Sequence, residues 1–136
     1  MGKVRQVFEY RFPSGLECAI ASISMPVDDI ARRHEMRLET WEEDGLGPAQ
    51  GFFVRLPSGR VVLIRQLAYA TKHFDKRGPD VFVDSDDVVN IGVAALVGEV
   101  LQALDLPQSA ITWIAEENVR QKAADMLGAL REQKMG

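Results

Sequence analysis

Cysteine is almost absent from the sequence, in which Cys18 is the single one among 136 residues. One cysteine excludes an internal disulfide and a four-cysteine metal site, so nothing in the chain requires an oxidising compartment. We expect Cys18 to be a small buried apolar residue in a strand.

Long apolar runs are also missing, because no run approaches the roughly 18 residues of a membrane-spanning helix. The first residues alternate in a strand-like pattern and include Lys3 and Arg5. They lack the continuous apolar core of a secretory signal. We therefore expect a cytoplasmic protein with no membrane partner.

Catalytic motifs are missing as well. His34 and His73 are far apart in the sequence, and neither belongs to an H-E-x-x-H or G-x-S-x-G pattern. The glycines at 45 and 47 lack the Lys-Ser/Thr of a phosphate-binding loop. A pairing of His73 with Asp75 or Cys18 stays open, because catalytic partners meet in the fold rather than in the sequence. The sequence predicts no catalytic residue and no cofactor, and thus a protein that is not an enzyme.

One stretch, residues 79–117, organises the chain as a strand, a helix and a second strand. We expect apolar strands at residues 81–83 and 111–115, and one long helix at residues 86–104. The large apolar residues of this helix recur at three-and-four spacing; they are Val89, Val93, Leu96, Val97, Val100, Leu101 and Leu104. Because Glu99 is the one charge in its interior, the helix is expected to be packed on more than one side.

Arg-(Phe/Leu)-Pro-Ser-Gly occurs twice, ending at Gly15 and at Gly59. Proline presets the first turn angle and glycine accepts a positive φ, so each copy predicts an antiparallel hairpin. The strands that these turns would join are 4–12 with 16–23, and 53–56 with 61–64.

Residues 24–33 carry the signals that begin a helix. Ser24 can cap the helix, Pro26 lies in its first turn, and Asp28 and Asp29 complement the positive end of the helix dipole. Residues 34–42 fit either a continued helix or a strand. We favour a short helix followed by a strand. A last helix is expected to begin near Glu117.

These patterns predict a single α+β domain over residues 1–136. It would contain a mostly antiparallel sheet of about five or six strands, packed against about two or three helices. A chain of this length buries roughly two thirds of its unfolded surface in one core, which leaves no room for a second domain.

Charge is unevenly distributed, although the net charge is only −4. Residues 55–77 contain six basic side chains and one acid, whereas residues 80–117 contain eight acids and no Lys or Arg. Such asymmetry can indicate a partner-binding surface. The alternative is that the two segments neutralise each other in the fold.

Asp84, Ser85, Asp86 and Asp87 lie where a predicted strand ends and a helix begins. Open α/β folds often bind ligands at such a place, and carboxylates there could hold Mg²⁺ or Ca²⁺. Asp and Ser are also ordinary helix caps, and acids in a first turn stabilise a helix by about 0.3–1 kcal/mol each. The spacing lacks the glycine and distal glutamate of a calcium loop. We predict a cap and no metal site.

Arg55 and Arg65 beside Phe52 and Phe53 suggest, at first sight, a sheet that stacks nucleic-acid bases. The strand period, however, places Phe53 with Arg55 on one face and Phe52 with Val54 on the other. The acidic chain also repels phosphate. We therefore expect no nucleic-acid partner.

Acidic side chains surround one tryptophan, Trp41, and form a second group further along the chain. An aromatic anchor rimmed by carboxylates suits a basic partner, because the charge speeds encounter and the ring supplies buried area. The predicted partner-binding residues are Trp41, Glu39, Glu42, Glu43, Asp44, Asp84, Asp86 and Asp87.

The leading hypothesis is a small acidic protein-binding module. Its most concrete form is an immunity or antitoxin-type inhibitor of a basic toxin such as a nuclease. The alternatives are a small metal-dependent hydrolase that uses Asp84, Asp86, Asp87 and His73, or a homo-oligomeric scaffold. The sequence does not determine the oligomeric state.

Overall fold

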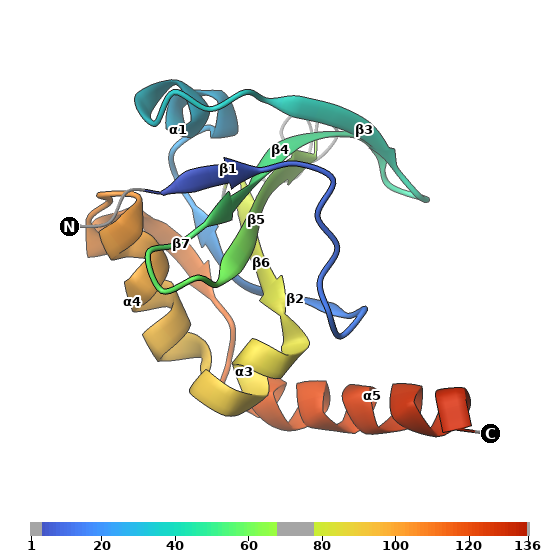
Figure 1. Ribbon diagram of the computed structural model, residues 1–136. Helices are drawn as coiled ribbons and strands as arrows, with labels where there is room; N and C mark the ends of the chain where they lie inside the picture. The colour runs from blue at the N-terminus through green and yellow to red at the C-terminus, as the bar shows by residue number, and fades with distance from the viewer. Residues whose placement is uncertain (1–3, 68–77, 136) are drawn as a thin grey trace.

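The computed structural model describes residues 4–67 and 78–135. These residues form a seven-stranded antiparallel sheet and four α-helices, which confirms the α+β class (Figure 1). The strands are β1 (Arg5–Val7), β2 (Glu17–Ile23), β3 (Glu39–Glu43), β4 (Gly47–Arg55), β5 (Val61–Leu67), β6 (Asp80–Asp84) and β7 (Ile111–Ile114). The helices are α1 (Val27–Arg33), α3 (Ser85–Ile91), α4 (Val93–Ala103) and α5 (Asn118–Met135), with a short 3-10 turn at Gln108–Ala110.

The sheet has the strand order β1-β4-β5-β6-β2-β7, and β3 lies beside β4 on the same edge as β1. Strands β6 and β7 are not neighbours, because β2 lies antiparallel between them. The sequence pattern of strand, helix and strand at residues 79–117 is therefore present, but its two strands are separated by a segment from much earlier in the chain. The sheet contains more strands than the five or six expected.

The second predicted hairpin is confirmed and the first is wrong. Strands β4 and β5 pair directly, with Arg55 opposite Val61 around the Pro-Ser-Gly turn. Strand β1 instead pairs with β4, and β2 pairs with β6 and β7. The first turn does form, since the Gly15 N–H donates to the Phe12 carbonyl at 2.9 Å. Glu9, with φ of 54°, interrupts the extended run before that turn, so residues 8–16 are a loop rather than a strand.

The predicted long helix is interrupted at Gly92, which ends α3 and begins α4. Its φ of 95° and ψ of 158° form a backbone conformation that glycine reaches without steric cost. The apolar spacing nevertheless predicted the core correctly, because Val93, Leu96, Val97 and Val100 are buried. The expectation that this helix is packed on more than one side is wrong for α4, because Ala94, Ala95 and Gly98 on its other side are exposed.

The hydrophobic core lies between one face of the sheet and helices α1 and α4 (Figure 1). Phe52 and Ile64 of the central strands are fully buried there, together with Val81 and Leu96. We call this side of the sheet the core face. The opposite side, which carries Phe53 and its neighbours, is called the outer face.

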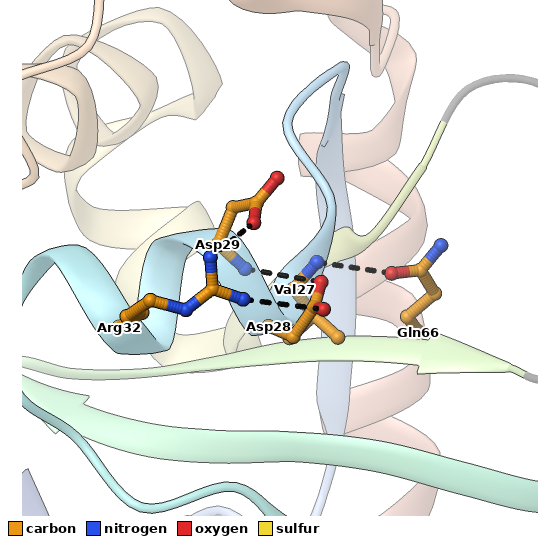
Figure 2. A network of polar contacts seen from close by, with 5 residues as sticks. All are labelled: Val27, Asp28, Asp29, Arg32 and Gln66. Atoms are coloured by element: carbon orange, nitrogen blue, oxygen red, sulfur yellow. Dashed lines mark hydrogen bonds and ion pairs between the residues drawn. The ribbon is translucent and has the colours of Figure 1, made fainter.

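Helix α1 is attached at its N-terminus to strand β5 (Figure 2). The Val27 N–H donates to Oε1 of Gln66 at 3.0 Å. The expected cap, Ser24, does not serve, because the N-cap position is Pro26 and has no side-chain hydrogen bond. The acids of the first turn pair with Arg32, at 3.6 and 3.1 Å for Asp28 and Asp29 respectively.

The short helix followed by a strand, which we favoured for residues 34–42, is confirmed, because α1 ends at Arg33 and β3 follows it. The backbone leaves the helix at His34, whose Nε2–H donates to the Leu104 carbonyl at 2.9 Å. Strand β3 then begins at Glu39. His34 therefore connects the end of α1 to the end of α4 and has a structural role.

Helix α5 packs against α3 beyond one end of the sheet (Figure 1). Ala123 and Leu127 are its buried residues, whereas Met126 is exposed. No helix in the described ranges combines the length and hydropathy that crossing a membrane requires.

Candidate functional site

The acidic residues around Trp41 are divided by the alternation of strand β3. Trp41 lies opposite Ala49 of β4, and Glu39 and Glu43 share its face because they are two residues away on either side. These three side chains belong to the outer face. Glu42 points to the other side of the strand, and Asp44 is exposed in the turn after it.

The outer face contains a cavity of about 340 Å³, called here the outer-face cavity. Its lining combines three aromatic rings with four carboxylates from three separate parts of the chain. The lining residues are Glu9, Tyr10, Glu17, Glu39, Trp41, Glu43, Phe53 and Leu63. This volume is large enough to hold a small molecule or one long side chain.

The aromatic wall of the cavity is held by packing between rings. Tyr10 contacts Phe53 with ring centroids 5.5 Å apart, and Phe12 contacts both, at 5.5 and 5.8 Å. Aromatic pairs at these separations in tilted or edge-to-face geometry are attractive. The loop that did not form the first hairpin thus places its rings on the outer face, against strand β4.

Glu43 connects the indole of Trp41 to the guanidinium of Arg65. The Trp41 Nε1–H donates to Glu43 Oε2 at 2.6 Å, and Arg65 Nη1 lies 3.4 Å from Glu43 Oε1. The Arg65 side chain is only 9% exposed and lies over the Phe82 ring, 4.2 Å from its centroid. Both Glu43 oxygens are therefore engaged, and Glu43 acts as a positioning residue that holds Trp41 in place.

Three other carboxylates line the cavity. Among the residues that the structure describes, Glu9, Glu17 and Glu39 form no ion pair. Partial burial raises the pKa of Glu17; the Arg65 guanidinium opposes this rise, and the Glu43 carboxylate adds to it. The cavity consequently has a surplus of negative charge next to aromatic rings.

The pKa of Glu17 leads to a pH-dependent prediction for Glu17→Gln. A folded-state pKa above the unfolded value means that the folded protein loses stability as pH rises between the two values, and this loss persists at neutral pH. Glu17→Gln should therefore raise the melting temperature at pH 7. The gain should disappear below the unfolded pKa of about 4, where both states are protonated. Thermal melts at both pH values test this, and a lower melting temperature of the variant at pH 7 would contradict it.

The second predicted acidic group forms a helix cap. Asp84 is 6% exposed, and its oxygens accept from Asp86 N at 2.9 Å and from Ser14 N at 3.1 Å. Asp86 also pairs with Arg131 at 3.5 Å. Burial raises the pKa of Asp87, and the Asp84 carboxylate adds to the rise. The cap predicted from the sequence is confirmed.

The two predicted acidic groups are not brought together. In Figure 1, β3 lies near the top of the sheet, whereas α3 lies below its lower end. Within the described ranges, no three His, Cys, Asp or Glu side chains are placed to hold a metal ion. His73, which the hydrolase alternative would use, lies outside the described residues.

Excess Mg²⁺, Ca²⁺ or Mn²⁺ is expected to leave the melting temperature nearly unchanged. Only a ligand bound to the native state stabilises it, and the oxygens of Asp84 are already engaged in the cap. Differential scanning fluorimetry with and without each ion provides the measurement. A rise of several degrees that Asp86→Asn abolishes would favour the hydrolase alternative instead.

A wider hollow of about 690 Å³ lies on the other side of β3, beside the N-terminus of α1. Two of its polar side chains serve the fold: Asp28 pairs with Arg32, and Gln66 accepts the N–H of Val27 (Figure 2). Glu42 also lines it, and Trp41 lines both this hollow and the outer-face cavity. This hollow therefore has less uncompensated charge than the outer-face cavity.

The basic and acidic segments of the chain partly neutralise each other, as the alternative interpretation held. Arg60 of the basic segment pairs with Glu99 of the acidic segment at 3.1 Å. The basic residues at 72, 76 and 77 lie outside the described residues. Cys18 is half-buried in β2, where burial raises the pKa of its thiol.

Sequence reasoning missed five lining residues of the outer-face cavity, Glu9, Tyr10, Glu17, Phe53 and Leu63. The strand period did place Phe53 on the opposite face from Phe52, but no local signal connects residues 9, 10 and 17 to residue 41. Comparison with protein-family models, curated proteins and solved structures gave no match. The function is therefore argued from this site alone.

Proposed function

We propose that this protein is a small binding module whose outer face binds a basic protein partner around Trp41. The observation that supports this most is the outer-face cavity, where aromatic rings stand beside carboxylates that have no ion-pair partner among the described residues. A cation supplied by a partner could contact the aromatic rings and form an ion pair with these carboxylates. The residues Glu39 and Trp41 come from the predicted partner-binding set.

The physical roles of these groups differ. Trp41 is partly exposed and has its indole fixed by Glu43, so it can bury area without losing much side-chain freedom. Aromatic residues in such positions contribute much of the binding energy at interfaces. The free carboxylates of Glu9, Glu17 and Glu39 would instead accelerate encounter with a positive surface. Asp84 is buried in its cap and is not part of the proposed surface.

The most concrete form of the proposal is an immunity or antitoxin-type inhibitor that masks a basic toxin such as a nuclease. A nuclease binds phosphate through basic side chains, so its active surface is complementary to an acidic aromatic face. The chain is also small, at 136 residues, and acidic, with a net charge of −4. An inhibitor of this type is expected to be encoded beside its toxin.

The test measures binding kinetics with the purified product of the neighbouring gene at two ionic strengths. Glu39→Lys should slow association, and the difference should shrink at high salt, which screens exposed charges. Glu42→Lys is the matched control, because it changes the charge of the same strand by the same amount on the opposite face. It should reduce the association rate less.

Trp41→Ala should mainly accelerate dissociation. Loss of a central aromatic anchor costs at least about 2 kcal/mol, which corresponds to about thirtyfold in the dissociation constant. Trp41→Phe retains a ring and should lose less. Binding that is indifferent to salt, to Glu39→Lys and to Trp41→Ala would show that this face is not the interface. Turnover of a small substrate without any protein partner would refute the proposed class.

A further inference from the structure

We infer that the outer-face cavity is a socket for a single arginine side chain of the partner. This inference deepens the proposed function and rests on it for the existence of a partner. The chemistry of the cavity can nevertheless be tested without that partner.

The lining of the cavity selects a cation. Tyr10, Trp41 and Phe53 present aromatic rings, whose faces attract positive charge. Glu17 and Glu39 add carboxylates from two different strands, and neither has an ion-pair partner among residues 4–67 and 78–135. A neutral or anionic group would leave these carboxylates without compensation and would meet repulsion.

The outer face already holds one arginine in the way proposed for the socket. The guanidinium of Arg65 lies over the Phe82 ring at 4.2 Å and pairs with Glu43 at 3.4 Å. Its side chain is nine-tenths buried, so the face accommodates a desolvated guanidinium between a ring and a carboxylate. The outer-face cavity also combines aromatic rings with carboxylates. Glu43 belongs to both sites, because it lines the cavity and pairs with Arg65.

Arginine suits the cavity better than lysine for two reasons. A guanidinium is planar, so it can lie on a ring while its N–H groups point sideways to carboxylates on either side. An ammonium is compact and strongly hydrated, and it loses more hydration on entering a site lined by rings and by the buried Leu63. The carboxylates come from both the loop at Glu9 and the strand at Glu39. This arrangement suits a guanidinium, because its N–H groups point in several directions.

The test follows the indole N–H signal of Trp41 by NMR while an amino-acid derivative is added. The chain has two tryptophans, so Trp113→Phe identifies the Trp41 signal. The probes are the Nα-acetyl amides of arginine, lysine and citrulline. Citrulline has nearly the shape of arginine but carries no charge. We expect the arginine derivative to shift the Trp41 signal saturably, with a dissociation constant about tenfold or more below that of citrulline.

Two variants assign the effect to the carboxylates. Glu17→Gln combined with Glu39→Gln should weaken binding of the arginine derivative several-fold and leave citrulline binding nearly unchanged. Glu42→Gln, on the opposite face of β3, should change neither. Equal binding of arginine and citrulline, tighter binding of lysine than of arginine, or no response at Trp41 would each overturn the socket.

Failure of the socket and failure of the proposed function give different results. If the neighbouring gene product binds and the binding depends on Trp41 and Glu39, while arginine and citrulline bind equally, the protein-binding function stands and the socket is wrong. If the arginine derivative binds at Trp41 and that gene product does not, the socket stands and the proposed partner is wrong.

Discussion

Replacement of Val97 by aspartate is expected to unfold the protein. Val97 is 3% exposed in α4 and belongs to the core between this helix and the sheet. A carboxylate buried there without a partner costs several kcal/mol, which is comparable with a total stability of about 5–15 kcal/mol. Circular dichroism and a thermal melt measure the loss.

The matched control for this change is Ala95→Asp. Ala95 lies two residues earlier in the same helix and is exposed, so its carboxylate would stay in water. Near the N-terminus of α4 the negative charge would also complement the helix dipole. The control should therefore melt close to the wild-type temperature. A Val97→Asp protein with wild-type melting would show that the buried face of α4 has been assigned incorrectly.

Replacement of Gly51 by alanine is expected to destabilise the protein by several kcal/mol. Gly51 is buried in β4, and a Cβ atom there would overlap the backbone carbonyl oxygen of Ile64 in β5. The backbone has little room to shift, because Gly51 lies in the β4–β5 register and is followed by the fully buried Phe52. Overpacking of such a site forces backbone displacement.

The same change is expected to disturb the outer-face cavity. Gly51 is paired with Glu39 of β3, and Phe53 of the cavity lies two residues further along β4. Gly98→Ala in α4 is the matched control, since a Cβ atom at that exposed position meets nothing within 4 Å. It should instead stabilise the helix by about 0.5–1 kcal/mol. Urea unfolding of both variants measures the opposite signs, and equal stabilities would refute the steric argument.

The sequence by itself determined the features that depend on neighbouring residues. The turn at residues 57–59 predicted the β4–β5 hairpin, because proline and glycine select the turn conformation locally. The strand period placed Phe52 and Phe53 on opposite faces of the sheet, and helical spacing predicted the buried face of α4. The group around Asp84 was likewise recognised as a cap, because capping acts within a few residues.

The tertiary structure alone decided which strands pair and which side chains meet. The turn ending at Gly15 formed but did not join two paired strands, because β1 and β2 found partners elsewhere in the sheet. The helix ended at Gly92 although the apolar spacing continued through it.

The outer-face cavity depends on the same long-range pairing. Its carboxylates at residues 9, 17 and 39 and its ring at residue 53 come from a loop and from different strands, so no sequence spacing connects them. Glu42 and Glu43 are adjacent in the sequence, yet the pleat of β3 points them to opposite sides of the strand. Glu43 accepts the indole N–H of Trp41 on the outer face, and Glu42 points away from that face. Local patterns act through a few bonds, whereas a site of this kind exists only after the sheet has brought distant residues together.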